Sequence, residues 1–149
     1  MNIYADPSFL VSLLYCGDTA HKKAVTFFSA QSGAQWITSS WSHFETVNSL
    51  RQLCLSNPGP EPAKIEGVRR LFKHWHERGP FLLLETETNE AVLECQQLSG
   101  AHATRTRMRS ADVLHVALLE QITPDLFVTR DKDQHELAVS RAFKSVLIP

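Results

Sequence analysis

Short apolar runs alternate with segments of helical periodicity along the chain. The apolar runs lie at residues 2–5, 36–38, 81–84, 126–129 and 145–148, and each has the length of a buried strand. Parallel strands need crossover connections, and these cover both faces of the sheet. The alternation therefore predicts an α/β fold with a five-stranded parallel sheet flanked by helices on both faces.

The segments between these runs carry helix start and stop signals. Asp6 followed by Pro7 is a cap with proline at the first helical position, and it predicts a helix to about Tyr15. The other expected helices begin at Asp18 or Thr19, run from Ser39 or Ser40 to about Leu55, from Ala63 to His76, from Asn89 to a stop at Gly100, from a cap at Ser110 to Gln121, and through Leu137 and Ala138.

The stretch "RSADVLHVALLEQ", from Arg109 to Gln121, poses a physical problem. Plotted as a helix it is apolar almost all round, which is typical of a buried helix, yet Asp112 lies on the same stripe as His115 and Leu119. A buried carboxylate without a partner is strongly unfavourable and tends to become protonated. We therefore expect a specific partner for Asp112.

Length and composition indicate one soluble globular domain. The chain has 149 residues, of which 43% are hydrophobic and 21% charged. No apolar run approaches the roughly 18 residues needed to cross a membrane, and the first residues lack a secretory signal pattern. The expectation is a cytoplasmic protein without membrane association.

Cysteine and charge patterns narrow the chemistry. Cys16, Cys54 and Cys95 are odd in number and widely spaced, which argues against a disulfide framework and predicts buried thiols. His74 and His76 point in different directions on a helix, so a zinc site is not expected there. With a net charge of −1, nucleic-acid contact would need local patches or a metal ion. The two basic stretches, 64–78 and 102–109, are equally compatible with solvated surface.

Four acids are expected at the carboxyl edge of the sheet. Asp6 follows the first strand, Glu45 lies early in the helix after the second, Asp112 opens its helix, and Asp131 follows the fourth strand. Taken singly, each has a structural explanation: Asp6 and Asp131 as caps, Glu45 in a capping box with Ser42, and Asp112 as a first-turn acid.

Taken together, the four acids favour a metal site. Carboxylates that converge without a partner repel one another, and a divalent cation such as Mg²⁺ or Mn²⁺ removes this conflict. The residues alone do not rank the candidates, because other acids could lie near the same edge: Asp18, Glu85, Glu87, Glu90 and Asp133.

A family resemblance supplies the ranking. Four blocks resemble, in order and spacing, the signature blocks of the PIN-domain family, and the whole chain, residues 1–149, resembles its VapC-type toxins. The blocks are "MNIYADPSFLVSLL", "TSSWSHFETVNSLRQ", "RSADVLHVALLEQ" and "LFVTRDKDQHELA". The resemblance implies that Asp6, Glu45, Asp112 and Asp131 bind metal.

The resemblance also implies supporting residues near the acids. Ser8 and Thr129 match the hydroxyl residues that accompany the first and last acids, and His115 is expected as a packed or hydrogen-bonded helper rather than a base. Pro7 and Arg130 depart from the residues usual in relatives. Basic side chains beside the site are candidates for binding RNA phosphates: Arg105, Arg107, Arg109, Arg130 and Lys132.

The activity that the resemblance implies is metal-dependent endoribonuclease activity. Asp6, Glu45 and Asp112 would hold the principal Mg²⁺ or Mn²⁺, and Asp131 would hold or orient a second ion or its water. The number of ions stays open, as does the choice between direct ligation by Asp131 and a contribution from Asp133.

The implied partners are RNA, often transfer RNA in relatives, a second copy of the chain in a homodimer, and an antitoxin protein. The helices flanking "SNPGPEP" are the candidate antitoxin contact, because Leu55 and Trp75 are expected to be exposed there.

Three alternatives remain. The chain could be a degenerate PIN domain that only binds a partner, although all four acids are present, or a stand-alone PIN nuclease without an antitoxin. A signalling receiver domain also places acids on a parallel sheet, but it requires an acidic pair after the first strand, where Asp6 is followed by Pro7.

Overall fold

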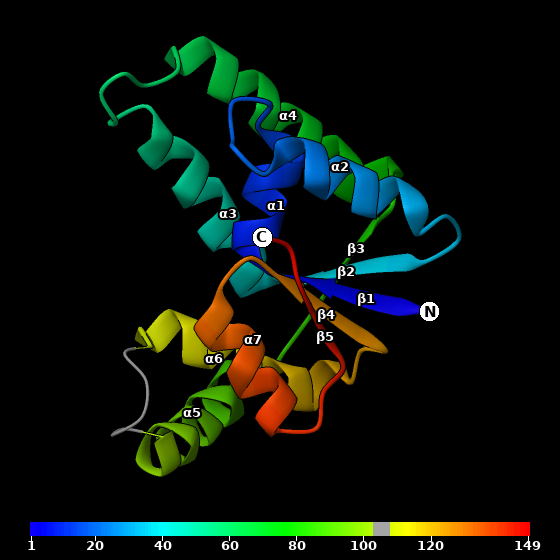
Figure 1. The fold of residues 1–149 in the computed structure, drawn as a ribbon, viewed down its shortest axis with the longest axis vertical. Coiled ribbons are helices and arrows are strands. Elements are labelled where there is room, and N and C mark those ends of the chain that lie inside the picture. The colour runs from blue at the N-terminus through cyan, green and yellow to red at the C-terminus, as the bar shows by residue number, and fades with distance from the viewer. Residues whose placement is uncertain (103–107) are drawn as a thin grey trace.

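A parallel five-stranded sheet lies between two helical layers in the computed structural model, which describes residues 1–102 and 108–149 (Figure 1). The strand order is β3-β2-β1-β4-β5, and every neighbouring pair is parallel. This confirms the fold expected from the alternation of apolar runs and helices. The strands are β1 (Asn2–Ala5), β2 (Gln35–Ser39), β3 (Phe81–Leu84), β4 (Leu126–Thr129) and β5 (Ser145–Leu147).

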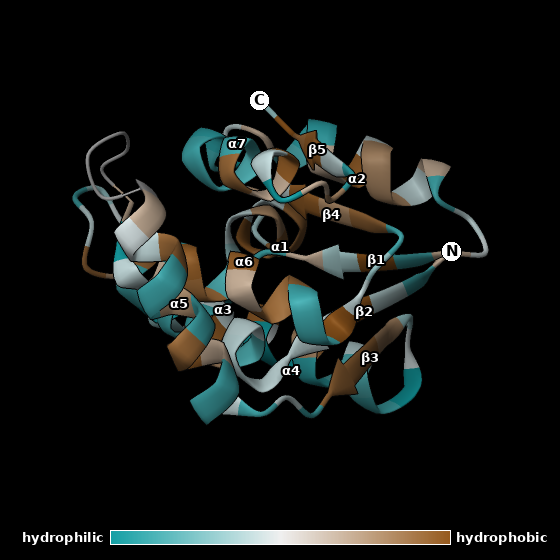
Figure 2. Cartoon of the chain, turned by 90° about the horizontal axis from the view of Figure 1, so that it is seen from below, coloured by the Kyte–Doolittle hydropathy of each residue, from teal (hydrophilic) through white to brown (hydrophobic). Residues whose placement is uncertain are grey.

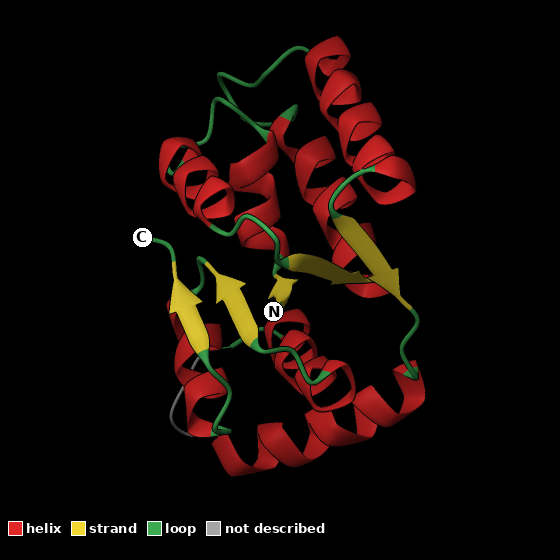
Figure 3. Ribbon diagram, turned by 90° about the vertical axis from the view of Figure 1, so that its right-hand side faces the viewer, coloured by secondary structure: helices red, strands yellow, loops and turns green. Residues whose placement is uncertain are grey.

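The helices form one layer on each face of the sheet. Those preceding β3 along the chain pack on one face, and the later ones pack on the other (Figures 1 and 3). The first layer is α1 (Pro7–Leu14), α2 (His21–Ala30), α3 (Ser40–Leu53) and α4 (Pro62–Arg78); the second is α5 (Thr88–His102), α6 (Ser110–Ile122) and α7 (Lys132–Ser140).

Two helix boundaries differ from the sequence expectation. Helix α5 continues through Gly100 to His102, so this glycine does not end it, and the helix is held by the burial of Ala91 and Leu98 against α6. Helix α6 begins at Ser110, which makes Arg109 its N-cap residue in place of Ser110. The free backbone N–H of Arg109 is bound instead by the Asp112 carboxylate.

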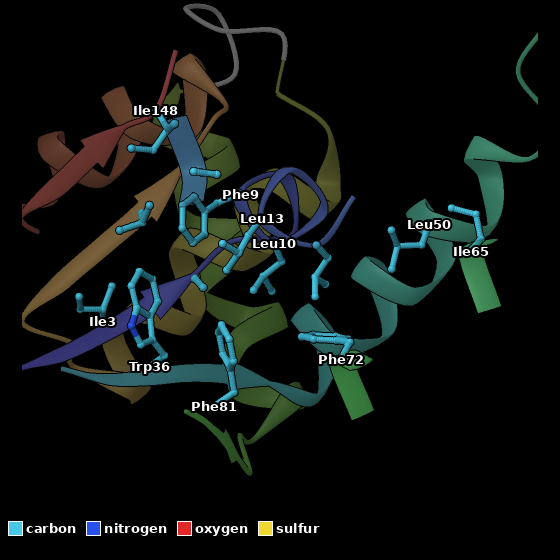
Figure 4. Packing of buried hydrophobic residues seen from close by; sticks show 14 residues of the cluster. Ile3, Phe9, Leu10, Leu13, Trp36, Leu50, Ile65, Phe72, Phe81 and Ile148 are labelled. Carbon is cyan, nitrogen blue, oxygen red and sulfur yellow. The ribbon is translucent and has the colours of Figure 1, made fainter. Parts of the chain in front are cut away.

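The first layer packs on an aromatic core. Trp36 of β2 stacks on Phe9 at a ring-centroid distance of 5.5 Å and lies 4.9 Å from Phe28. Figure 4 shows Trp36, Phe9 and Phe81 gathered over the sheet. Trp75 stacks on Phe28 and Phe81 at 5.7 Å, so its expected exposure was wrong.

The second layer packs around α6, which is buried from Val113 to Leu119 as its sequence predicts. Apolar colouring runs through this helix and the central strands, whereas hydrophilic residues gather on outward-facing helices (Figure 2). Asp112 lies in the first turn and is only half-buried, so its expected place on a fully buried face was wrong.

The three cysteines differ in exposure. Cys16 is exposed, which corrects the expectation of a buried thiol, and Cys54 and Cys95 are partly buried. Over residues 1–102 and 108–149, none of the helices has the length and apolar character needed to cross a membrane.

Candidate metal-binding site

A pocket of about 270 Å³ opens at the carboxyl edge of the sheet, and all four acids singled out in the sequence line it. Asp18, one of the other acids near this edge, lines it as well, whereas Glu85, Glu87, Glu90 and Asp133 do not. The complete lining is Asp6, Pro7, Ser8, Val11, Asp18, Glu45, Ser49, Arg109, Asp112, Arg130, Asp131 and Gln134.

The strand order explains why the pocket forms here. From β1 the chain crosses to β2 on one side, while β4 pairs with β1 on the other, so the crossover direction changes between β1 and β4. Ligand sites of open parallel sheets collect at such switch points. Asp6 directly follows β1 and donates its backbone N–H to Val128 of β4 at 3.0 Å, which places Asp6 beside Thr129.

Asp6 is the most deeply buried of these acids, with 2% of its surface exposed. Its Oδ2 accepts hydrogen bonds from the Ser8 backbone N–H at 2.9 Å, from the Ser8 hydroxyl and from Thr129 Oγ1 at 3.2 Å. Its Oδ1 is also buried, and within the described part of the chain it has no hydrogen-bond partner. Burial raises the pKa of Asp6 above its usual range.

Asp112 and Asp131 each use one carboxylate oxygen at a helix start. Asp112 Oδ2 accepts from the Arg109 backbone N–H at 2.9 Å, and Asp131 Oδ1 accepts from the Gln134 backbone N–H at 2.9 Å. Burial raises the pKa of Asp112, and the negative charges of Asp131, Asp6 and Glu45 raise it further against the effect of the Arg109 hydrogen bond. The acids are therefore close enough to repel one another.

Glu45 is held by His115. The two side chains meet at 2.8 Å between Oε2 and Nε2, with 28% of the Glu45 side chain and 1% of the His115 side chain exposed. The other ring nitrogen of His115 lies 3.1 Å from the Tyr4 hydroxyl. His115 is thus a buried, hydrogen-bonded neighbour of the pocket and not one of the residues that line it.

The hydroxyls of Thr129 at the end of β4 and Ser8 in α1 link residues of the pocket to one another. Thr129 Oγ1 contacts Asp6 and Gln134 and accepts the Asp131 backbone N–H at 2.9 Å. Ser8 Oγ accepts the Arg130 backbone N–H at 2.9 Å.

Gln134 is a site residue that sequence reasoning missed. It is 3% exposed, contacts Thr129 Oγ1 at 2.8 Å, and its amide lies 3.4 Å from Asp112 Oδ1. Its position three residues after the Asp131 cap was the available signal, because a cap carboxylate accepts from the residue two or three positions along the helix.

The basic residues are placed unequally. Arg130 lines the pocket, and its Nη1 donates to Asp18 at 3.0 Å and to Ser12 Oγ at 2.8 Å. Arg109 also lines the pocket, whereas the exposed Lys132 pairs with Glu136 on its own helix. Arg105 and Arg107 lie outside the described residues.

The donor chemistry of the pocket fits a divalent cation. No three His, Cys, Asp or Glu side chains in residues 1–102 and 108–149 are grouped closely enough to hold a metal ion. However, five carboxylates line one pocket, three of them disfavour the charge of Asp112, and the buried Asp6 Oδ1 has no donor among the described residues. Hard oxygen ligands of this kind are preferred by Mg²⁺ and Mn²⁺.

Comparison with known proteins identifies the fold. No protein-family model matches the sequence, and no curated protein matches it. A solved structure of VapC20 from Mycobacterium tuberculosis, described as a sarcin-ricin loop cleaving toxin, has a TM-score of 0.71 at 14% identity over 97% of this chain and 98% of that chain. The FitAcB structure from Neisseria gonorrhoeae has a TM-score of 0.61 at 13% identity over 96% and 95%. At these identities the likeness concerns the architecture alone: the chain has a PIN-like fold.

Proposed function

We propose that this protein is a Mg²⁺- or Mn²⁺-dependent endoribonuclease, the toxin of a toxin-antitoxin pair, with residues 1–149 forming one PIN domain. The observation that carries the proposal is the buried Oδ1 of Asp6, which has no hydrogen-bond partner in the part of the chain that the structure describes and lies in a pocket lined by four further acids. Burying a carboxylate oxygen without a partner is unfavourable, and a cation bound to that oxygen would remove this cost. The likeness in fold to VapC20, which is described as a sarcin-ricin loop cleaving toxin, supports the same activity.

The ligand assignment follows the pocket. Asp6, Glu45 and Asp112 would hold the principal ion, and Asp131 would hold or orient a second ion or its water. A bound divalent ion lowers the pKa of coordinated water and acts as a Lewis acid toward the attacked phosphate. Ser8 and Thr129 occupy Asp6 Oδ2 and thereby leave Oδ1 as the oxygen available to a ligand.

The basic residues of the rim would bind the RNA backbone. Arg109 and Arg130 line the pocket, and a guanidinium recognises phosphate oxygens through paired hydrogen bonds. Asp18 keeps Arg130 at the rim before the substrate arrives. Lys132 is a further candidate for a phosphate contact, and Arg105 and Arg107, outside the described residues, are candidates from the sequence. We expect a structured or single-stranded RNA such as transfer RNA.

The proposed protein partners are a second copy of the chain and an antitoxin. The α3–α4 pair and its connection present apolar side chains to solvent: Phe44 of α3 is 58% exposed, and Leu55, just after α3, is 75% exposed. Such side chains on a helix pair suit an amphipathic segment of an antitoxin.

Expression in a host without the antitoxin tests the function. Wild type is expected to arrest growth, and Asp6→Asn and Asp112→Asn are expected to abolish the arrest because each removes a metal-binding oxygen. Asp125→Asn is the matched control: Asp125 is exposed and accepts a hydrogen bond from Asn2 at the opposite, amino edge of the sheet. Equal toxicity of all four proteins would rule the proposal out. Purified wild type that cleaves no RNA with Mn²⁺ present would favour a PIN domain that only binds a partner.

A further inference from the structure

A chain of buried hydrogen bonds leads from the core of the second layer to the pocket. Ser39 Oγ lies 3.0 Å from the Tyr4 hydroxyl, and this hydroxyl lies 3.1 Å from His115 Nδ1. His115 Nε2 lies 2.8 Å from Glu45 Oε2. Ser39, Tyr4 and His115 are each at most 1% exposed, so the chain is shielded from water until it reaches Glu45.

The available hydrogens give this chain a direction. Ser39 Oγ already accepts the Ser42 backbone N–H at 3.1 Å, so its own hydrogen can go to the Tyr4 oxygen. Tyr4 has one hydroxyl hydrogen, which can then go to His115 Nδ1. A neutral imidazole that accepts at Nδ1 carries its hydrogen on Nε2, which faces the Glu45 carboxylate.

The opposite direction fails for a neutral ring. If Nδ1 carried the hydrogen, the lone pair of Nε2 would face the carboxylate oxygen of Glu45 at 2.8 Å. Two acceptors at that distance repel, and the lone pair of His115 Nε2 would be buried without a hydrogen-bond donor. Of the two neutral forms of His115, the geometry therefore selects the one with its hydrogen on Nε2.

We propose that Tyr4 and Ser39 act as positioning residues for the pocket: they fix His115 in its Nε2–H form, and His115 holds the Glu45 carboxylate ready for the cation. The link to the cation rests on the proposed function. Ser39 strengthens the arrangement because the same oxygen caps α3, the helix that carries Glu45. One buried hydroxyl thus sets both the start of the helix and the orientation of its carboxylate.

Stability alone does not explain why this hydrogen-bonded chain includes the hydroxyl of Tyr4. Tyr4 stacks on Phe127 at 5.9 Å in an otherwise apolar cluster, where a phenylalanine would fill nearly the same volume. Buried hydrogen-bond networks are favourable only when every member is satisfied, and a partly broken one is costly. This network is satisfied at each step and ends on a pocket acid, which is the arrangement of a group that orients a ligand.

Tyr4→Phe is the primary test, because it removes one hydroxyl and keeps the ring. The matched control is Thr46→Val, which removes an equally buried hydroxyl that donates within α3 to the Ser42 carbonyl oxygen at 2.7 Å. The first readout is the ¹⁵N NMR signature of the His115 ring in metal-free protein at pH 8, assigned by comparison with His115→Gln. The second is the Mn²⁺ dissociation constant from calorimetry.

We expect the Nε2–H signature in wild type and in Thr46→Val. We expect Tyr4→Phe to lose that signature or to show a mixture, and to bind Mn²⁺ about tenfold or more weakly, the usual cost of removing an orienting group behind a metal ligand. Thr46→Val should stay within about twofold of wild type. His115→Gln, whose amide can still donate toward Glu45, should bind Mn²⁺ more tightly than His115→Ala.

Each contrary result has one meaning. An Nδ1–H or doubly protonated His115 ring in wild type overturns the inference, and so does a Tyr4→Phe protein with unchanged ring signature and unchanged Mn²⁺ affinity. Wild type that binds no Mn²⁺ overturns the proposed function. In that case the ring signature alone tests whether Tyr4 and Ser39 fix His115 in its Nε2–H form. The NMR readout keeps the two failures distinguishable.

Discussion

The aromatic core and the acid pocket lie at different parts of the same sheet and follow opposite rules. Around Trp36 the rings of Phe9, Phe28 and Phe81 fill the space with apolar contacts. Around Asp6 the chain buries a carboxylate whose Oδ1 has no partner in the residues described, beside other acids. The aromatic core stabilises the fold, whereas the acid pocket destabilises it and depends on the rest of the packing to stay folded.

The pKa shifts show the same contrast in electrostatic terms. Burial raises the pKa of Asp6 and of Asp112, so folding without a cation places their negative charges in an unfavourable environment. Strain of this kind is typical of a site that binds an ion or reacts. Without a cation, substitutions of the pocket acids should therefore leave the free energy of unfolding unchanged or raise it, whereas substitutions in the aromatic core should lower it.

The largest effect is expected in the core. Trp36→Ala should lower the free energy of unfolding by about 3–5 kcal/mol, the usual cost of truncating a buried aromatic residue. In a domain of this length that corresponds to a drop in Tm of roughly 6–20 °C, measured by circular dichroism. Phe44→Ala is the control, because Phe44 is 58% exposed and should change stability by about 0.5 kcal/mol or less. Similar losses for both variants would contradict the contrast.

Adding the cation should reverse the cost of the pocket. With Mn²⁺ at one hundred times its dissociation constant, wild type should gain about 2.7 kcal/mol of stability, because the ion binds the folded chain only. Asp6→Asn should lose this gain, whereas Trp36→Ala, measured at a temperature where it remains folded, should keep it. Thermal melts with and without Mn²⁺ measure both. A gain retained by Asp6→Asn would place the ion elsewhere.

Removing one pocket charge without metal should cost little or nothing. In metal-free protein, Asp112→Asn should leave the free energy of unfolding unchanged or raise it by at most about 1 kcal/mol, because Asp112 is half exposed and its repulsion is partly screened. The asparagine oxygen can still accept the Arg109 backbone N–H. A drop in Tm of several degrees would mean that Asp112 is a structural partner.

The smallest effect is a difference in pH dependence. Folded-state pKa values of Asp6 and Asp112 are raised, so their contribution to metal-free stability is complete below their usual pKa of about 3.9 and is lost as the pH rises through the folded values. Burial lowers the pKa of His43 and His76 beside the aromatic core, so their contribution falls as the pH drops below about 6.5. The two regions therefore respond to acid in opposite directions.

The wild type and Asp112→Asn separate these two responses. Both proteins contain the histidines, so the stability advantage of Asp112→Asn should shrink between pH 7 and pH 4 as Asp112 takes up a proton in wild type. Urea unfolding of metal-free protein at four pH values measures the difference. An advantage that grows toward pH 4 would contradict the raised pKa of Asp112.

The fold was predictable because its signals are local. Each apolar run forms a strand close to the expected bounds, and Asp6 with Pro7 starts α1 as expected. The errors also have physical reasons. Gly100 continues α5 because packing against α6 outweighs its low helix propensity, and Trp75 is covered by Phe28 and Phe81, which are distant in sequence.

The pocket was predictable in outline only. Topology places the residues that follow β1 and β4 at one edge, and this brings Asp6 and Asp131 together. The spacing from the Asp131 cap pointed to Gln134 only weakly, and nothing in the sequence singled out the Arg130 pairing with Asp18 or the contact of Tyr4 with His115. Each of these two contacts joins side chains whose directions are set by packing between separate elements.

The sequence by itself thus determined the alternation of strands and helices and the edge at which the acids lie, since periodicity and crossover connections follow from the order of residues. The packing of the elements was needed to show which oxygen of Asp6 has no donor among the described residues and which buried hydroxyls are linked to Glu45 through His115. The reason is that a hydrogen bond forms within about 3 Å, and that precision comes from the close packing of elements far apart in the chain.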